Sequence, residues 1–109
     1  MISHVLLAAM LASPNAALIP ARNAYSKCLT TLMRTDLKEK VDAAAFEAKL
    51  ATACKAEEAA FRAASIAADV AVKIARATAD RNASDEIGYI RENTVENYKG
   101  YLETDTSPR

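Results

Sequence analysis

The chain has 109 residues, and a chain of this length folds as one domain with a modest hydrophobic core. Its 14 Lys and Arg balance its 14 Asp and Glu, and neither sign forms a block. Such a neutral surface does not attract a polyanion, so we expect no nucleic-acid binding. Alanine is the commonest apolar residue. Because alanine buries little area, helices must approach closely to form a core.

The first residues have the features of a secretory signal peptide. Residues 1–17 contain no Lys, Arg, Asp or Glu, and an apolar run from Val5 to Ala12 precedes small and polar residues. We therefore expect this leader to be removed by cleavage after Ala17. A buried first helix in a cytosolic protein is the alternative. A membrane span is disfavoured, because it needs about 20 apolar residues and Pro14 interrupts the run early.

Two cysteines follow the leader, Cys28 and Cys54, and the chain has no others. An even number of cysteines in an exported chain favours a disulfide. The polar segment 35–42 lies midway between them, so a turn there would place the two cysteines opposite each other in an antiparallel helical hairpin. Two buried free thiols are the alternative in a cytosolic protein. The spacing does not fit a C-x-x-C redox pair, and a zinc site would lack further ligands.

Both cysteines lie on the apolar stripe of a predicted helix. The first stripe contains Ala21, Tyr25, Cys28 and Leu32, and the second contains Phe46, Leu50, Cys54 and Phe61. The same hairpin register places Tyr25 opposite Glu57. We therefore expect the phenol of Tyr25 to hydrogen-bond this carboxylate at a partly buried position.

A long second helix is predicted to begin after Asp42, whose side chain can cap it. Alanine-rich sequence then continues to about Ala79, and no Gly or Pro occurs between Pro20 and Gly88. The pattern leaves open whether residues 42–103 form one broken helix or two separate helices.

The second helix has two distinct surfaces. Its polar face carries two acid–base pairs at a spacing of four residues, Glu58 with Arg62 and Asp69 with Lys73. We interpret this face as solvated rather than as a binding patch. The later half also carries a second apolar ridge, formed by Ile66, Val70 and Ile74. Unless another helix covers this ridge, it is a candidate interface.

A third helix is predicted to follow residues 80–86, with Asn82 or Ser84 as its cap. Its apolar stripe contains Ile87, Ile90, Thr94, Tyr98 and Leu102. Packed back antiparallel on the later half of the second helix, it would place Tyr98 near Ala67. A tyrosine ring over alanine would permit close packing.

The sequence lacks most residues of the common catalytic sites. The only histidine, His4, lies in the leader, so the mature chain would contain none. This excludes Ser-His-Asp and Cys-His catalysis and any histidine metal site. Met33 is the only methionine after the leader, and no glycine-rich phosphate-binding loop is present. We therefore expect no enzymatic activity, no cofactor and no bound metal.

The segments AYSKC, FEAKLATAC and EAAFR, behind an apolar leader, resemble small two-cysteine helical proteins that Gram-negative bacteria export. The resemblance covers residues 21–62. It implies export and a disulfide, and it implies no particular activity.

Taken together, the sequence predicts an all-α protein: a disulfide-stapled antiparallel helical hairpin with a long second helix and a third helix packed on its C-terminal half. We expect a signal peptide at 1–17, one helical domain at 18–103 and a disordered tail at 104–109, with Tyr89 exposed. The predicted function is a periplasmic or secreted interaction or structural module that binds an unknown protein or itself. The alternatives are a small carrier of an apolar ligand and a cytosolic partner-binding protein.

Overall fold

The computed structural model describes residues 16–109, which form four helices and no strand. The helices are α2 (Leu18–Lys38), α3 (Ala43–Leu50), α4 (Lys55–Ala71) and α5 (Arg76–Thr104). The predicted all-α class is therefore confirmed. Most of the predicted signal peptide lies outside the described residues.

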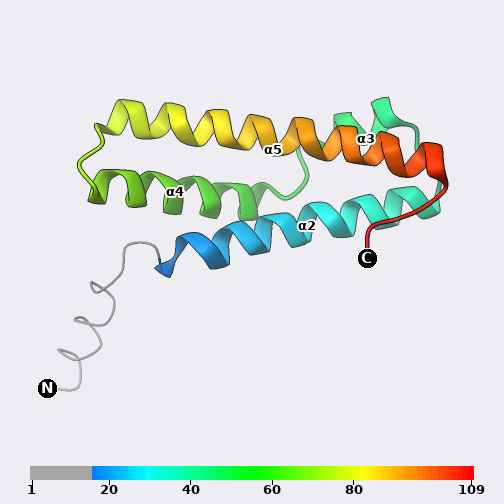
Figure 1. Ribbon diagram of the computed structural model, residues 1–109, viewed down its shortest axis with the longest axis horizontal. Coiled ribbons are helices and arrows are strands. Elements are labelled where there is room, and N and C mark those ends of the chain that lie inside the picture. Colours follow the sequence, from blue (N-terminus) through cyan, green and yellow to red (C-terminus); the bar gives the residue numbers. More distant parts are fainter. Residues whose placement is uncertain (1–15) are drawn as a thin grey trace, which may run out of the picture.

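The helices run back and forth along one long axis (Figure 1). From the disulfide region, α4 runs back along the first half of α2, and α5 then returns along α4 and continues to the short helix α3. Helix α2 begins partway along α4, so α4 and α5 alone form one end of the molecule. We call this end, residues 65–83, the tip, and the remaining helical part the body.

Three of the helices end in the same backbone motif. Lys40, Lys73 and Asp105 adopt positive φ angles of 53°, 71° and 54°, and each directly follows the last turn of a helix. After α2, the Val41 N–H donates to the Asp36 carbonyl at 3.0 Å, and equivalent bonds follow α4 and α5. These are Schellman motifs, in which glycine is the usual left-handed residue. The chain thus makes its helix ends without glycine.

The long second helix predicted from Asp42 to about Ala79 is interrupted twice, so that prediction is wrong. Its start is confirmed, because Asp42 Oδ1 accepts a hydrogen bond from the Ala45 N–H at 2.9 Å. The helix stops at Leu50, and Cys54 has a φ of 60°, which breaks the α-helical path before α4. A second break separates α4 from α5 at residues 72–75.

The predicted start of the third helix is also wrong. Helix α5 begins at Arg76, so Asn82 and Ser84 lie inside it and do not cap it. Because the turn comes earlier than predicted, α5 is shifted relative to α4. Tyr98 lies not near Ala67 but over Phe46, with ring centroids 3.9 Å apart.

The core has two parts of different composition. The body core contains the buried residues Tyr25, Leu29, Met33, Phe46, Leu50, Phe61, Ile87, Val95 and Tyr98. The tip has only a small cluster of Ile66, Ala79 and Ala83, with Ile74 packed against it. Aromatic rings therefore fill the space where three or four helices meet, whereas alanines let two helices pack closely in the tip.

The end of the chain lies along α2. Arg34 Nε donates to the Pro108 carbonyl at 3.1 Å, and Lys40 Nζ is 2.8 Å from Asp105 Oδ1. The disorder expected for residues 104–109 stays a prediction.

Candidate functional site

The disulfide joins the middle of α2 to the start of α4. Cys28 and Cys54 are bonded, with their Cα atoms 6.0 Å apart, which confirms the predicted pairing. Cys54 occupies the N-cap position of α4. The bond therefore anchors α4 to α2 directly after the break in the chain. A disulfide is consistent with an oxidising extracellular environment.

One carboxylate connects three helices next to the disulfide. Glu58 of α4 accepts a hydrogen bond from the Tyr25 hydroxyl of α2 at 3.4 Å and forms an ion pair with Arg91 of α5. Burial raises the pKa of Tyr25, the Glu58 charge raises it further, and Arg91 opposes the shift. The sequence pattern predicted Glu57 as the hydrogen-bond partner of Tyr25, and this prediction is wrong by one position. The break at Cys54 shifts the face of α4 relative to α3, so the phase set by Phe46 does not continue into α4.

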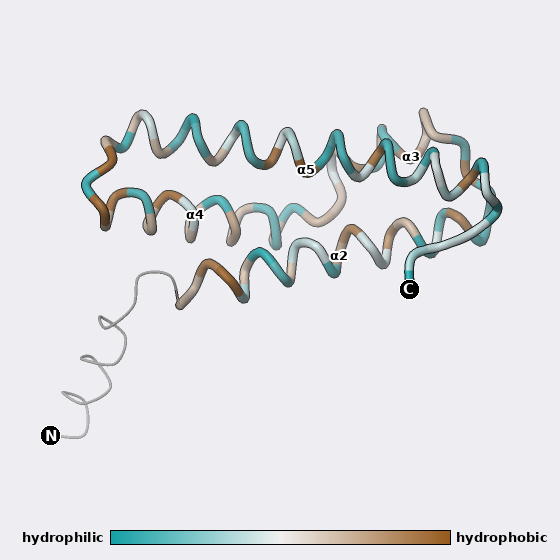
Figure 2. The backbone as a smooth tube through the Cα atoms, in the orientation of Figure 1, coloured by the Kyte–Doolittle hydropathy of each residue, from teal (hydrophilic) through white to brown (hydrophobic). Residues whose placement is uncertain are grey.

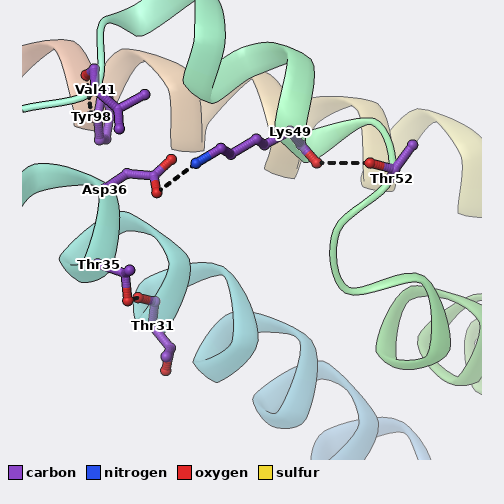
Figure 3. Close-up of polar contacts among 7 residues, drawn as sticks. All are labelled: Thr31, Thr35, Asp36, Val41, Lys49, Thr52 and Tyr98. Carbon is purple, nitrogen blue, oxygen red and sulfur yellow. Dashed lines mark hydrogen bonds and ion pairs between the residues drawn. The ribbon is translucent and has the colours of Figure 1, made fainter. Parts of the chain in front are cut away.

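A second buried polar cluster holds α3 in place. Asp36 of α2 is 1% exposed, and its Oδ1 is 3.0 Å from Lys49 Nζ, which reaches across from α3 (Figure 3). Nearby, the Tyr98 hydroxyl of α5 donates to the carbonyl of Val41. Burial raises the pKa of Tyr98, and the charges of Asp36 and Asp42 add to this effect. The cluster joins α2, α3 and α5 around the turn that follows α2.

The predicted pairs on the polar face of α4 do not form. Glu58 pairs with Arg91 instead of Arg62, whose Nη1 donates to Ser84 Oγ at 2.8 Å. Asp69 accepts a hydrogen bond at 3.1 Å from the Asn82 side chain, and Lys73 lies beyond the end of α4. Side chains of this face therefore bond to α5, because α5 begins early enough to lie against it, and these two hydrogen bonds remain exposed to solvent.

The ridge of Ile66, Val70 and Ile74 is partly covered. Ile66 is buried against alanines of α5, and Ile74 is half-buried, whereas Val70 is 44% exposed. Val72, which was not predicted as part of the ridge, is 69% exposed at the turn between α4 and α5. Figure 2 shows hydrophobic residues on both sides of this turn. Exposed apolar side chains thus gather at the end of the tip.

A groove of about 500 Å³ lies between α3 and α5, in the body. Its apolar or small lining residues are Leu50, Ala51, Gly88 and Val95. Carboxylates from both helices, Glu47 of α3 with Glu92 and Glu96 of α5, line it together with Arg91 and Lys99. The lining of the groove is thus partly apolar and partly charged, a combination suited to a polypeptide segment.

Sequence reasoning missed this groove because it depends on the break between α3 and α4. Gly88 was the available signal, since a glycine inside a helix lowers helix stability and calls for an explanation. Tyr89, which precedes the predicted stripe residue Ile90, is 68% exposed, as expected.

Within residues 16–109, no group of three or more His, Cys, Asp or Glu side chains could hold a metal ion. In the same range, none of the helices combines the length and the hydropathy needed to cross a membrane. Comparison of the chain with protein-family models, with curated proteins and with solved structures finds no match.

Proposed function

We propose that this chain is an exported, non-catalytic helical module that binds a protein partner through its tip, in the periplasm or outside the cell. Two features support export. The leader at residues 1–17 has the composition of a signal peptide, and the disulfide suits an oxidising compartment.

The exposed apolar side chains of the tip carry the proposed binding role. Val70 and Val72 are 44% and 69% exposed, and both lie within four residues of the half-buried Ile74. Burying apolar area of this kind against a partner is favourable, and rims of charged residues give such contacts their specificity. Lys73 and Arg76 follow the valines at the same turn, and Asp69 directly precedes them.

A carrier of an apolar ligand has less support. The three hollows described on the surface have volumes of about 500, 440 and 230 Å³, and each is lined in part by charged or polar side chains. An apolar ligand would favour a mostly apolar pocket with only a few polar groups.

Intact-mass spectrometry of the protein from its native cell fraction tests export. We expect a chain shortened at its N-terminus that gains the mass of two hydrogen atoms on reduction. A full-length chain with two thiols that react with an alkylating agent would place the protein in a reducing compartment and contradict the proposal.

Site-specific photocrosslinking tests partner binding. A photoreactive residue at Val72 should crosslink to a protein in intact host cells. The same residue at Thr31, an exposed position on α2, is the matched control and should not. Equal crosslinking at the two positions, or none at Val72, would exclude the tip as the binding surface.

A further inference from the structure

The tip and the groove carry opposite unpaired charges beside apolar surface. At the tip, Lys73 stands between the exposed Val72 and the half-buried Ile74, and Arg81 follows on α5. Neither Lys73 nor Arg81 belongs to any of the ion pairs among residues 16–109. The carboxylates of the tip are engaged within it, because Asp80 pairs with Arg76 and Asp69 accepts a hydrogen bond from Asn82. The unpaired charge of the tip is therefore mainly basic, beside exposed apolar side chains.

The groove has the complementary character. Lys99 of its lining pairs with Glu96, and Arg91 pairs with Glu58. The two remaining carboxylates, Glu47 and Glu92, take part in no ion pair within the described part of the chain. The exposed small residues Ala51 and Gly88, beside two unpaired carboxylates, would accept an apolar segment that carries a basic side chain.

Gly88 in the groove is not required by the fold. It lies inside α5 with a helical backbone, and a Cβ atom added to it would meet no other atom within 4 Å. Glycine at such a position lowers helix stability relative to alanine, with no compensating contact inside the chain. A docked segment that approaches the α5 backbone closely would account for it.

One copy of the chain cannot join these two surfaces. The tip is formed by the turn between α4 and α5, whereas the groove lies farther along α5, beside residues 88–99 and α3 (Figure 1). A contact between them must therefore link two copies, and it would be heterologous, because different surfaces meet. Heterologous contacts that do not close into a ring produce open-ended assemblies.

From these observations we infer that the partner of the tip is a second copy of this chain, whose α3–α5 groove receives the tip. Val70 and Val72 cover Ala51 and Gly88, and Lys73 lies between the carboxylates of Glu47 and Glu92. The inference rests on the proposed function and specifies the partner of the same surface.

Mixing two defective variants tests the contact directly. Val72→Asp disables the tip but leaves the groove intact, whereas the double substitution Glu47→Lys and Glu92→Lys disables the groove but leaves the tip intact. In sedimentation velocity at low ionic strength, we expect the wild-type sedimentation coefficient to rise with concentration and each variant alone to stay monomeric. An equimolar mixture of the two should form a heterodimer and nothing larger, because each copy retains one working surface.

Two matched controls separate docking from general effects of charge. Ile19→Asp introduces the same charge at another exposed apolar position, outside both surfaces, and should assemble like the wild type. Lys73→Glu combined with the groove double substitution should restore the assembly, because the charges are exchanged. Circular dichroism should show all variants to be folded.

Three outcomes would overturn the inference: a wild-type chain that is monomeric at all concentrations, assembly that survives both variants, or a mixture that forms no heterodimer. Val72 could still crosslink to a different protein in cells. In that case the proposed function would stand and self-assembly would be excluded.

Discussion

The body and the tip use different kinds of packing along the same pair of helices. In the body, α4 and α5 pack with α2 and α3 around stacked aromatic rings, Phe46 on Tyr98 and Tyr25 near Phe61. In the tip the same two helices pack only on each other, mainly through alanine. Because alanine buries little area, the tip should contribute less to stability and should open locally more often.

The covalent and polar links between helices are also concentrated in the body. The disulfide, the carboxylate of Glu58 that joins three helices, and the ion pair of the buried Asp36 with the half-exposed Lys49 all lie in the body. The tip has one side-chain hydrogen bond between its helices, from Asn82 to Asp69. The exposed valines therefore occur where the fold is least constrained, as is usual for surfaces that bind.

Truncating an aromatic ring in the body should have the largest effect. Phe46 is fully buried, so we expect Phe46→Ala to lower the free energy of unfolding by about 3–5 kcal/mol. Ile66→Ala is the matched change in the tip, and we expect it to cost about 2 kcal/mol, because a two-helix edge can relax around the lost volume. Urea unfolding measures both. Equal losses would show that the tip is as tightly coupled as the body.

Removing the disulfide should have the next largest effect. The bond links residues separated by 26 positions, so the double variant Cys28→Ala and Cys54→Ala should lose about 3–4 kcal/mol of unfolding free energy. Thermal unfolding with and without a reductant checks this value. In hydrogen exchange, the start of α4 should then exchange as fast as the tip. If the tip alone became faster, the disulfide would not be what holds α4 to the body.

High pH should weaken the body through its two buried tyrosines. Burial, followed by nearby carboxylates, raises the pKa of both Tyr25 and Tyr98. Above pH 10 the unfolded chain loses phenolic protons that the folded chain still holds, so the unfolded state binds fewer protons and stability falls with rising pH. Between the unfolded pKa and the raised one, each tyrosine contributes up to about 1.4 kcal/mol per pH unit.

Denaturant unfolding between pH 9 and pH 11 measures this slope. The variant Tyr98→Phe should show a shallower decline than the wild type, even though it also loses the hydrogen bond to Val41. Lysine deprotonation affects both proteins alike and cancels in the comparison. Identical slopes would mean that Tyr98 ionises as readily in the folded chain as in the unfolded one.

The smallest expected effect is a gain in stability at the tip. Lys73 holds a left-handed backbone conformation that glycine adopts without strain, so Lys73→Gly should stabilise the protein by about 1 kcal/mol. Lys40→Gly is the control in the body, and it should gain less because it removes the ion pair with Asp105. The thermal midpoints rank the two variants.

The control variant Lys40→Gly also tests the ion pair between Lys40 and Asp105. A hydrogen bond from Lys40 and its positive charge lower the pKa of Asp105, so Lys40→Gly should raise that pKa towards its ordinary value. A carboxyl titration followed by NMR would show the shift. An unchanged pKa would indicate that the ion pair does not persist in solution.

The sequence by itself determined the features that depend on local spacing. Asp42 caps a helix, and Tyr89 faces solvent. Each follows from the helical period or from hydrogen bonds between residues only a few positions apart, and neither requires knowledge of distant parts of the chain.

Only the tertiary structure decided where the helices break and which residues of neighbouring helices lie opposite each other. Left-handed residues at Cys54 and Lys73 cost about 1–2 kcal/mol each, and nothing in an alanine-rich sequence marks these positions. That cost is offset by burying Phe46 on Tyr98 and Phe61 near Tyr25, contacts between segments far apart in the chain. The breaks in turn select Glu58 over Glu57, place Asn82 and Ser84 inside α5, and create the groove that contains Gly88.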